Sequence, residues 1–74
     1  MLQVATPRTL GQYLRQLRLS SMYPLSLGEM AKRCKCSKTF VFDVESDRSK
    51  IGLNQAVNFA KAYSTTLNKM AEYL

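Results

Sequence analysis

Residues 26–45, SLGEMAKRCKCSKTFVFDVE, decide the fold of this chain because they predict two short helices with a turn between them. Ser26 and Glu29 have the spacing of a capping box, in which the serine hydroxyl accepts the amide N–H of the glutamate and the glutamate side chain reaches back. Ser37 can cap the second of the two helices, which is expected over residues 38 to 46.

The turn between these helices has the pattern of a helix-turn-helix. The first helix is expected to run to about Cys34, and Ala31 is small at a place where two helices can approach closely. Beyond the turn, apolar residues recur at the spacing of an inward-facing helix surface: Cys36, Val41 and Val44. The stretch therefore predicts a helix pair of the kind that DNA-binding proteins use.

The rest of the chain is also expected to be helical, which gives an all-α domain of five helices. Thr9 and Gln12 form a second capping box, and Pro7 discourages helix before it, so residues 1–8 are expected to be an arm and residues 9–74 the folded domain. Apolar residues at helical spacing predict the remaining helices from Thr9 to about Leu19, from Leu53 to Tyr63, and from Thr65-Thr66 toward the C-terminus.

The balance of charge limits the range of possible functions and partners. Eleven Lys and Arg face five Asp and Glu, and the resulting net charge of +6 favours nucleic acid or another anionic surface as the partner. A basic protein without a polyanionic partner is the alternative. The chain has no His and no glycine-rich phosphate loop, so neither an enzyme nor a bound cofactor is expected.

The size and the N-terminal sequence suggest where the protein works. A chain of 74 residues is long enough for one domain, and no apolar run approaches the roughly 20 residues that a membrane span needs. The first residues, MLQVATPRT, lack the basic start and apolar stretch of a secretory signal. A cytoplasmic, nucleoid-associated protein is expected, with no membrane partner.

Cys34 and Cys36 form a Cys-x-Cys pair, for which three interpretations are possible: a metal site, core packing or redox sensing. A zinc site needs about four ligands, and the chain offers no further Cys and no His, so no metal is expected. In the helix-turn-helix register both cysteines replace apolar core residues, and core packing is the favoured reading. A redox-sensing role remains open if one thiol is exposed.

Five stretches, taken in order, resemble the Cro/lambda-repressor-like (XRE) family. They are Leu10-Gly11-x-x-Leu14-Arg15-x-Leu17-Arg18, Leu25-Ser26-x-x-Glu29-Met30-Ala31, Ser37-Lys38-Thr39-x-Val41-x-x-Val44-Glu45, Leu53-x-x-Ala56-Val57-x-Phe59-Ala60-Lys61-Ala62-Tyr63 and Thr66-Leu67-x-x-Met70. The resemblance implies a compact five-helix DNA-binding domain. The chain departs from the family pattern at Leu27, where a Gln is common, at Lys35, where the turn usually has Gly, and in a longer loop over residues 19–24.

The resemblance also implies roles for individual residues. Arg18 and Glu45 match an ion pair that joins the first helix to the end of the third; two solvated surface charges are the alternative. Ser37 matches a phosphate-contacting position. Positions that face the major groove in the family correspond to Lys38, Thr39, Phe42 and Asp43, and positions that contact the DNA backbone correspond to Arg48 and Lys50.

The chemistry of these side chains suits base reading. If Val41 and Val44 face inward, helical spacing turns Thr39 and Asp43 outward. A threonine or a phenyl ring can pack on a thymine methyl, a carboxylate can accept from the cytosine amino group, and a lysine can bind a phosphate or a guanine edge. Phe40 is expected to pack under the loop at residues 22–24. For Phe42 the sequence leaves DNA, a protein partner and the core as possibilities.

The last helix suggests a homodimer. Its apolar stripe exceeds what one small core needs, and the expected dimer surface consists of Leu67, Met70, Tyr73 and Leu74. We expect a transcriptional regulator of phage or mobile-element type, acting as a repressor that binds a palindromic operator in double-stranded DNA as a homodimer. The alternative is a protein-interaction module on the same fold, such as an antirepressor or antitoxin, without sequence-specific DNA reading.

Overall fold

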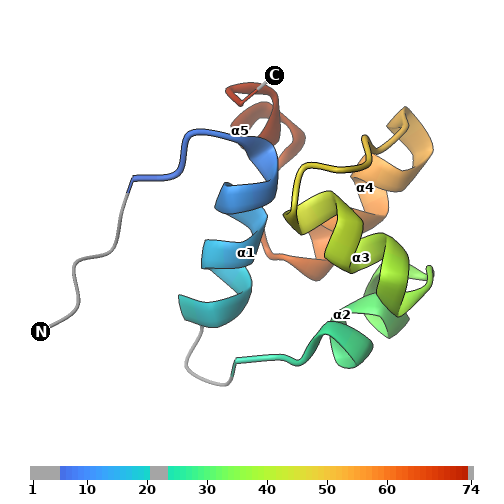
Figure 1. Ribbon diagram of the computed structural model, residues 1–74. Coiled ribbons are helices and arrows are strands. Elements are labelled where there is room, and N and C mark those ends of the chain that lie inside the picture. Colours follow the sequence, from blue (N-terminus) through green and yellow to red (C-terminus); the bar gives the residue numbers. More distant parts are fainter. Residues whose placement is uncertain (1–5, 21–23, 74) are drawn as a thin grey trace, which may run out of the picture.

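The computed structural model describes residues 6–20 and 24–73, and within these residues the chain forms five α-helices and no strand (Figure 1). The prediction of an all-α domain is confirmed. The helices are α1 (Leu10–Ser20), α2 (Leu27–Cys34), α3 (Lys38–Glu45), α4 (Leu53–Ala62) and α5 (Leu67–Ala71). In the described part of the chain, none of them is long and apolar enough to cross a membrane.

Four of the helices, α1, α2, α3 and α5, begin at capping residues that the sequence predicts. The hydroxyl oxygens of Ser26, Ser37 and Thr66 accept backbone N–H groups at 3.0 to 3.1 Å. At the start of α1, the Thr9 hydroxyl accepts the Gln12 amide at 3.2 Å. The Gln12 side chain, however, accepts from the Arg8 amide at 2.9 Å, one residue earlier than the expected capping box.

Three helices end in the same way, with a residue other than glycine in the left-handed region. Lys35, Asp47 and Ser64 have φ of 61°, 61° and 57°, and each follows the last residues of α2, α3 or α4. In each case the next amide reaches back five residues to a helix carbonyl, at 2.8 to 3.0 Å. This pattern is the Schellman motif, which usually places glycine at the left-handed position.

The core lies where α3 packs against α1 and α2, and where α4 packs against α2. Val41 and Val44 face inward as expected and are buried, as is Cys34, while Cys36 is half-buried. Phe40 packs edge to face on Phe59, with ring centroids 6.1 Å apart. Its expected neighbours Met22 and Tyr23 lie outside the described residues.

The predicted dimer stripe is wrong in one residue. Met70 is only 3% exposed and belongs to the core, because the short α5 turns this side chain toward the other helices. Tyr73 is half-buried and stacks on Tyr13 at 4.6 Å, so much of its ring already has a partner within the chain. Leu67 is 42% exposed, and Leu74 lies outside the described residues.

Candidate nucleic-acid interface

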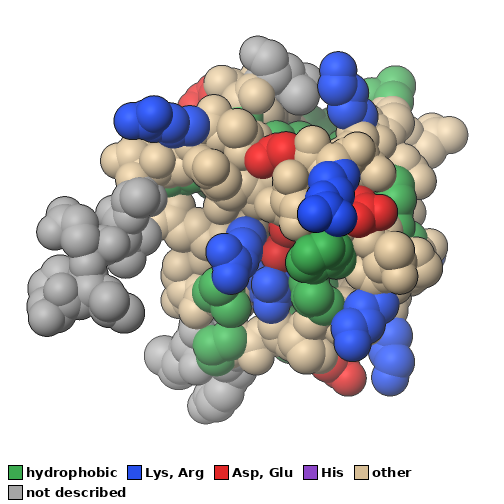
Figure 2. Space-filling model, viewed as in Figure 1, with side chains coloured by type: hydrophobic (Ala, Val, Ile, Leu, Met, Phe, Trp, Pro, Cys, Tyr) green, Lys and Arg blue, Asp and Glu red, His purple; other side chains and the backbone are tan. Residues whose placement is uncertain are grey.

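One side of α3 remains uncovered, and it carries most of the predicted DNA-contacting residues. Ser37, Lys38 and Thr39 are exposed at its start, Phe42 is 45% exposed, and Asp43 is half-buried. The Ser37 oxygen is occupied by the Phe40 amide at 3.0 Å, which leaves its O–H free to donate to an anion. In the view of Figure 2, Lys and Arg side chains lie close to hydrophobic side chains, with Asp and Glu side chains among them.

The basic side chains lie almost entirely at the surface of the protein. Every Lys and Arg is exposed except Arg18. Two of the carboxylates already have partners within the chain: the buried Glu45 pairs with Arg18, and the exposed Asp47 accepts hydrogen bonds from the start of α1. The exposed cations include Arg48 and Lys50, in the segment after α3 where the family resemblance implies backbone contacts.

Arg48 lies against α3, with its guanidinium carbon 5.8 Å from the centre of the Phe42 ring. The backbone explains this position. The Arg48 amide donates to the Asp43 carbonyl at 2.8 Å and the Asp47 amide to the Val44 carbonyl at 3.1 Å, which completes the Schellman motif. That motif commonly brings the residue after the left-handed position into contact with the last turn of the helix, which here presents Phe42.

Asp47 ties the end of α3 to the start of α1, a role that the sequence analysis did not foresee. Its carboxylate accepts the Thr9 hydroxyl at 2.6 Å and the Gly11 amide at 3.0 Å. A side chain on Gly11 would place Cβ 2.5 Å from the Val44 carbonyl oxygen, so only glycine allows this approach. The preference of Asp for left-handed positions is the one sequence signal that points to Asp47.

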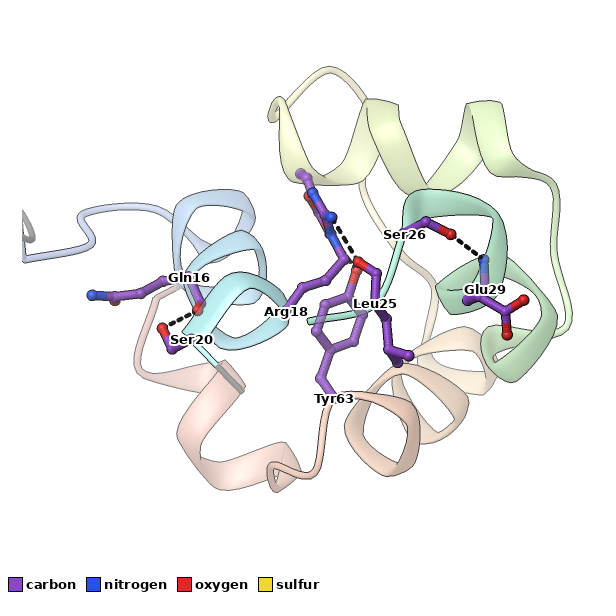
Figure 3. Close-up of polar contacts among 8 residues, drawn as sticks. Gln16, Arg18, Ser20, Leu25, Ser26, Glu29 and Tyr63 are labelled. Atoms are coloured by element: carbon purple, nitrogen blue, oxygen red, sulfur yellow. Dashed lines mark hydrogen bonds and ion pairs between the residues drawn. The ribbon is translucent and has the colours of Figure 1, made fainter. Parts of the chain in front are cut away.

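The predicted ion pair between Arg18 and Glu45 is present and nearly buried. The guanidinium donates to both carboxylate oxygens at 2.8 Å, and to the Leu25 carbonyl at 3.0 Å. Tyr63, whose hydroxyl the sequence analysis overlooked, donates to the same carboxylate at 2.7 Å. Figure 3 shows Arg18 reaching from α1 toward Leu25, with Tyr63 beside it. This Arg18–Glu45–Tyr63 network joins α1, α3 and the end of α4.

The pKa directions in this network agree with its geometry. The hydrogen bond to Glu45, which outweighs the effect of burial, raises the pKa of Arg18. Burial is the main cause that raises the pKa of Tyr63, and the carboxylate that it contacts adds to the effect. Both groups therefore hold their protons throughout the ordinary pH range.

The two cysteines lie at the turn between α2 and α3, where Cys34 is buried in the core and Cys36 is half-buried. Burial is the main cause that raises the pKa of Cys34 to about 12, and burial also raises the pKa of Cys36. A thiol of this kind is a weak nucleophile at neutral pH, because the thiolate is the reactive form. Across residues 6–20 and 24–73, no three metal-binding side chains gather into a cluster.

The structure has a second surface feature besides the exposed side of α3. A groove of about 760 Å³ runs between the start of α1, the segment after α3, the start of α4 and α5. The apolar side chains that line it include Leu10, Ile51, Leu53, Ala56, Leu67 and Ala71. Leu53 is 79% exposed, an unusual state for so large an apolar side chain.

Comparisons with protein-family models, with curated proteins and with solved structures found no match to this chain.

Proposed function

We propose that this protein is a sequence-specific DNA-binding transcriptional regulator that inserts α3 into the major groove. In this proposal α2, the turn and α3 form a helix-turn-helix, and the protein acts as a homodimeric repressor on a palindromic operator. The observation that carries the proposal is the uncovered side of α3, which presents hydrogen-bonding, cationic and aromatic side chains among exposed cations.

The geometry of the helix pair supports this function. Residues 35–37 alone separate α2 from α3, which fits the short turn of a helix-turn-helix. Val41 and Val44 fix the rotation of α3 by burying one side, so Lys38, Thr39 and Phe42 are on the side that a groove can receive. The buried Arg18–Glu45–Tyr63 network holds the end of α3 in place.

Selection from a random duplex pool at about 150 mM salt tests the proposal, because specific binding typically exceeds non-specific binding by ~10³-fold or more. We expect a short palindrome to be recovered. Thr39→Ala should then weaken operator binding by about tenfold, the usual effect of a lost base contact, and leave random DNA unaffected. Lys61→Ala, which removes an exposed cation from α4, is the control. Equal affinity for selected and random duplexes would contradict the proposal.

The exposed aromatic ring favours a second candidate, a protein-interaction module on the same helices. Phe42 is 45% exposed, and large apolar side chains at a surface often mark protein contacts. A stable complex with another protein that survives Lys38→Ala and Thr39→Ala but not Phe42→Ala would favour this candidate over DNA binding.

A further inference from the structure

The end of α3 presents an apolar ring and a guanidinium as one unit. The Arg48 guanidinium carbon lies 5.8 Å from the centre of the Phe42 ring, within the range of a cation–π contact. Both side chains are exposed, so the unit can meet a partner without rearrangement of the core. We call these two residues the Phe42–Arg48 pair.

The backbone around the pair is held at several points. The amides of Arg48 and Ser49 both donate to the Asp43 carbonyl, at 2.8 and 3.3 Å. Asp47, the residue before Arg48, is held to Thr9 and Gly11 by its carboxylate. The position of Arg48 beside Phe42 therefore follows from how α3 ends, and the pair is preorganised before any partner binds.

Each half of the pair matches a feature of the major groove. A phenyl ring packs on the C5-methyl of thymine, and a guanidinium donates two hydrogen bonds to O6 and N7 of guanine. Their separation of 5.8 Å equals one to two base-pair steps at roughly 3.4 Å each. A single side of the groove can thus offer both features to the pair.

We propose that the Phe42–Arg48 pair is a specificity element that reads a thymine methyl together with a guanine one or two base pairs away. The inference rests on the proposed DNA-binding function and deepens it. It changes the role of Arg48 from the backbone contact implied by the family resemblance to a base contact. Lys50, exposed two residues later and without an aromatic neighbour among the described contacts, remains suited to a phosphate.

DNA fits this surface better than an apolar protein partner does. Arg48 contacts the ring, and the exposed residues Ser37, Lys38 and Thr39 precede Phe42 on the same short helix segment. A protein interface centre usually lacks such a density of charge, whereas protein–DNA interfaces are polar and strongly positive.

Base analogues test the inference once an operator has been selected. Uracil in place of the thymine removes only the methyl group, and 7-deazaguanine in place of the guanine removes only the N7 acceptor. For the wild-type protein we expect uracil to weaken binding about 4-fold, the value of one buried methyl, and 7-deazaguanine to weaken it about 5-fold or more. Phe42→Ala should lose the response to uracil, and Arg48→Ala the response to 7-deazaguanine.

Arg48→Lys also separates a base contact from a phosphate contact, because it keeps the charge. A base contact predicts at least tenfold weaker operator binding with unchanged binding to random DNA. A phosphate contact predicts little change on either duplex, which would overturn the assignment of Arg48. Phe42→Leu, which keeps an apolar side chain, shows whether any loss in Phe42→Ala comes from misfolding.

The outcomes distinguish this inference from the function on which it rests. If selection recovers an operator and Phe42→Ala still responds to uracil as the wild type does, the inference fails and the proposed function stands. If selection recovers no sequence, or Phe42 is needed only for a complex with another protein, both fail.

Discussion

At the scale of single residues, the stability of the fold depends strongly on one buried carboxylate. Glu45 is 6% exposed and accepts hydrogen bonds from Arg18 and Tyr63. Within the described residues, no buried side-chain nitrogen or oxygen lacks a hydrogen-bond partner. Removing one member of this network leaves another polar group buried without a partner, and this is costly in a low-dielectric interior.

We therefore expect Arg18→Ala to lower the free energy of unfolding by about 3 kcal/mol, because it leaves a buried carboxylate without its cation. Tyr63→Phe removes one hydrogen bond to the same carboxylate and should cost about 1–2 kcal/mol. Denaturant unfolding of both single variants and the double variant measures the coupling. Losses that add strictly would show that the two side chains do not act through Glu45.

Burial of Cys34 makes the stability depend on pH in the alkaline range. The folded protein holds the Cys34 proton up to a pKa of about 12, whereas the unfolded thiol releases it near 9. The resulting contribution is complete below pH 9 and is lost as the pH rises from 9 to 12. Over this range the wild type should lose about 1 kcal/mol per pH unit more than Cys34→Ala, in denaturant titrations at fixed ionic strength. Parallel pH profiles would contradict this prediction.

At the scale of helices, glycine substitutions at the three left-handed residues can distinguish the cost of backbone strain from the contribution of the side chain. Lys35 and Ser64 have exposed side chains, and within the described residues neither side chain makes a hydrogen bond. Glycine at these two sites should therefore raise the free energy of unfolding by about 0.5–1 kcal/mol. Asp47→Gly relieves the same backbone strain but loses two hydrogen bonds to α1, and it should lower stability by about 1 kcal/mol. Thermal unfolding compares the three variants directly, and a stabilised Asp47→Gly would show that the link to α1 contributes little.

The contact between α1 and α3 allows a sharper test at Gly11. A methyl group there would meet the carbonyl oxygens of Val44 and Glu45 at 2.5 and 2.7 Å, and backbone atoms cannot move aside as a flexible side chain can. Despite the higher helix propensity of alanine, Gly11→Ala should lower the free energy of unfolding by about 2–3 kcal/mol. Gly28→Ala is the control, because its nearest atom would be 3.9 Å away. Equal stability of the two variants would contradict the close approach of the helices.

The same helices show what the sequence can and cannot predict. The starts follow from local capping by Ser26, Ser37 and Thr66, and the inward side of α3 follows from the spacing of Val41 and Val44. Lys35, at the position where the resembled family usually has Gly, adopts the left-handed conformation. The anchoring by Asp47 and the hydroxyl contact of Tyr63 join residues 36 and 18 positions apart, and no local pattern encodes such contacts. The burial of Met70 was not predictable from the apolar stripe alone, because it depends on how α5 is oriented against the core.

At the scale of the whole molecule, the apolar groove and the exposed side of α3 divide the surface into two parts with different chemistry. The α3 side combines hydrogen-bonding groups with exposed cations, whereas most of the residues that line the groove are apolar, with Leu53 and Leu67 exposed at it and Asp47 and Lys50 at its border with the segment after α3. A two-fold dimer needs a surface that is complementary to itself. A protruding leucine beside an apolar groove meets this need, because each copy can place Leu53 in the groove of the other.

We therefore expect the dimer of the proposed repressor to form through the groove and not through the full stripe of the last helix. Leu53→Glu and Leu67→Glu should convert the dimer to a monomer, because each buries a charge in an apolar contact. Sedimentation equilibrium measures the mass of each variant. The monomeric variants should bind a half operator as the wild type does, but they should lose the cooperative binding to the whole operator. Leu19→Glu is the matched control, since Leu19 is 48% exposed but does not line the groove. A wild-type protein that stays monomeric at high concentration and on the operator would exclude the dimer, and dissociation by Leu19→Glu alone would place the interface elsewhere.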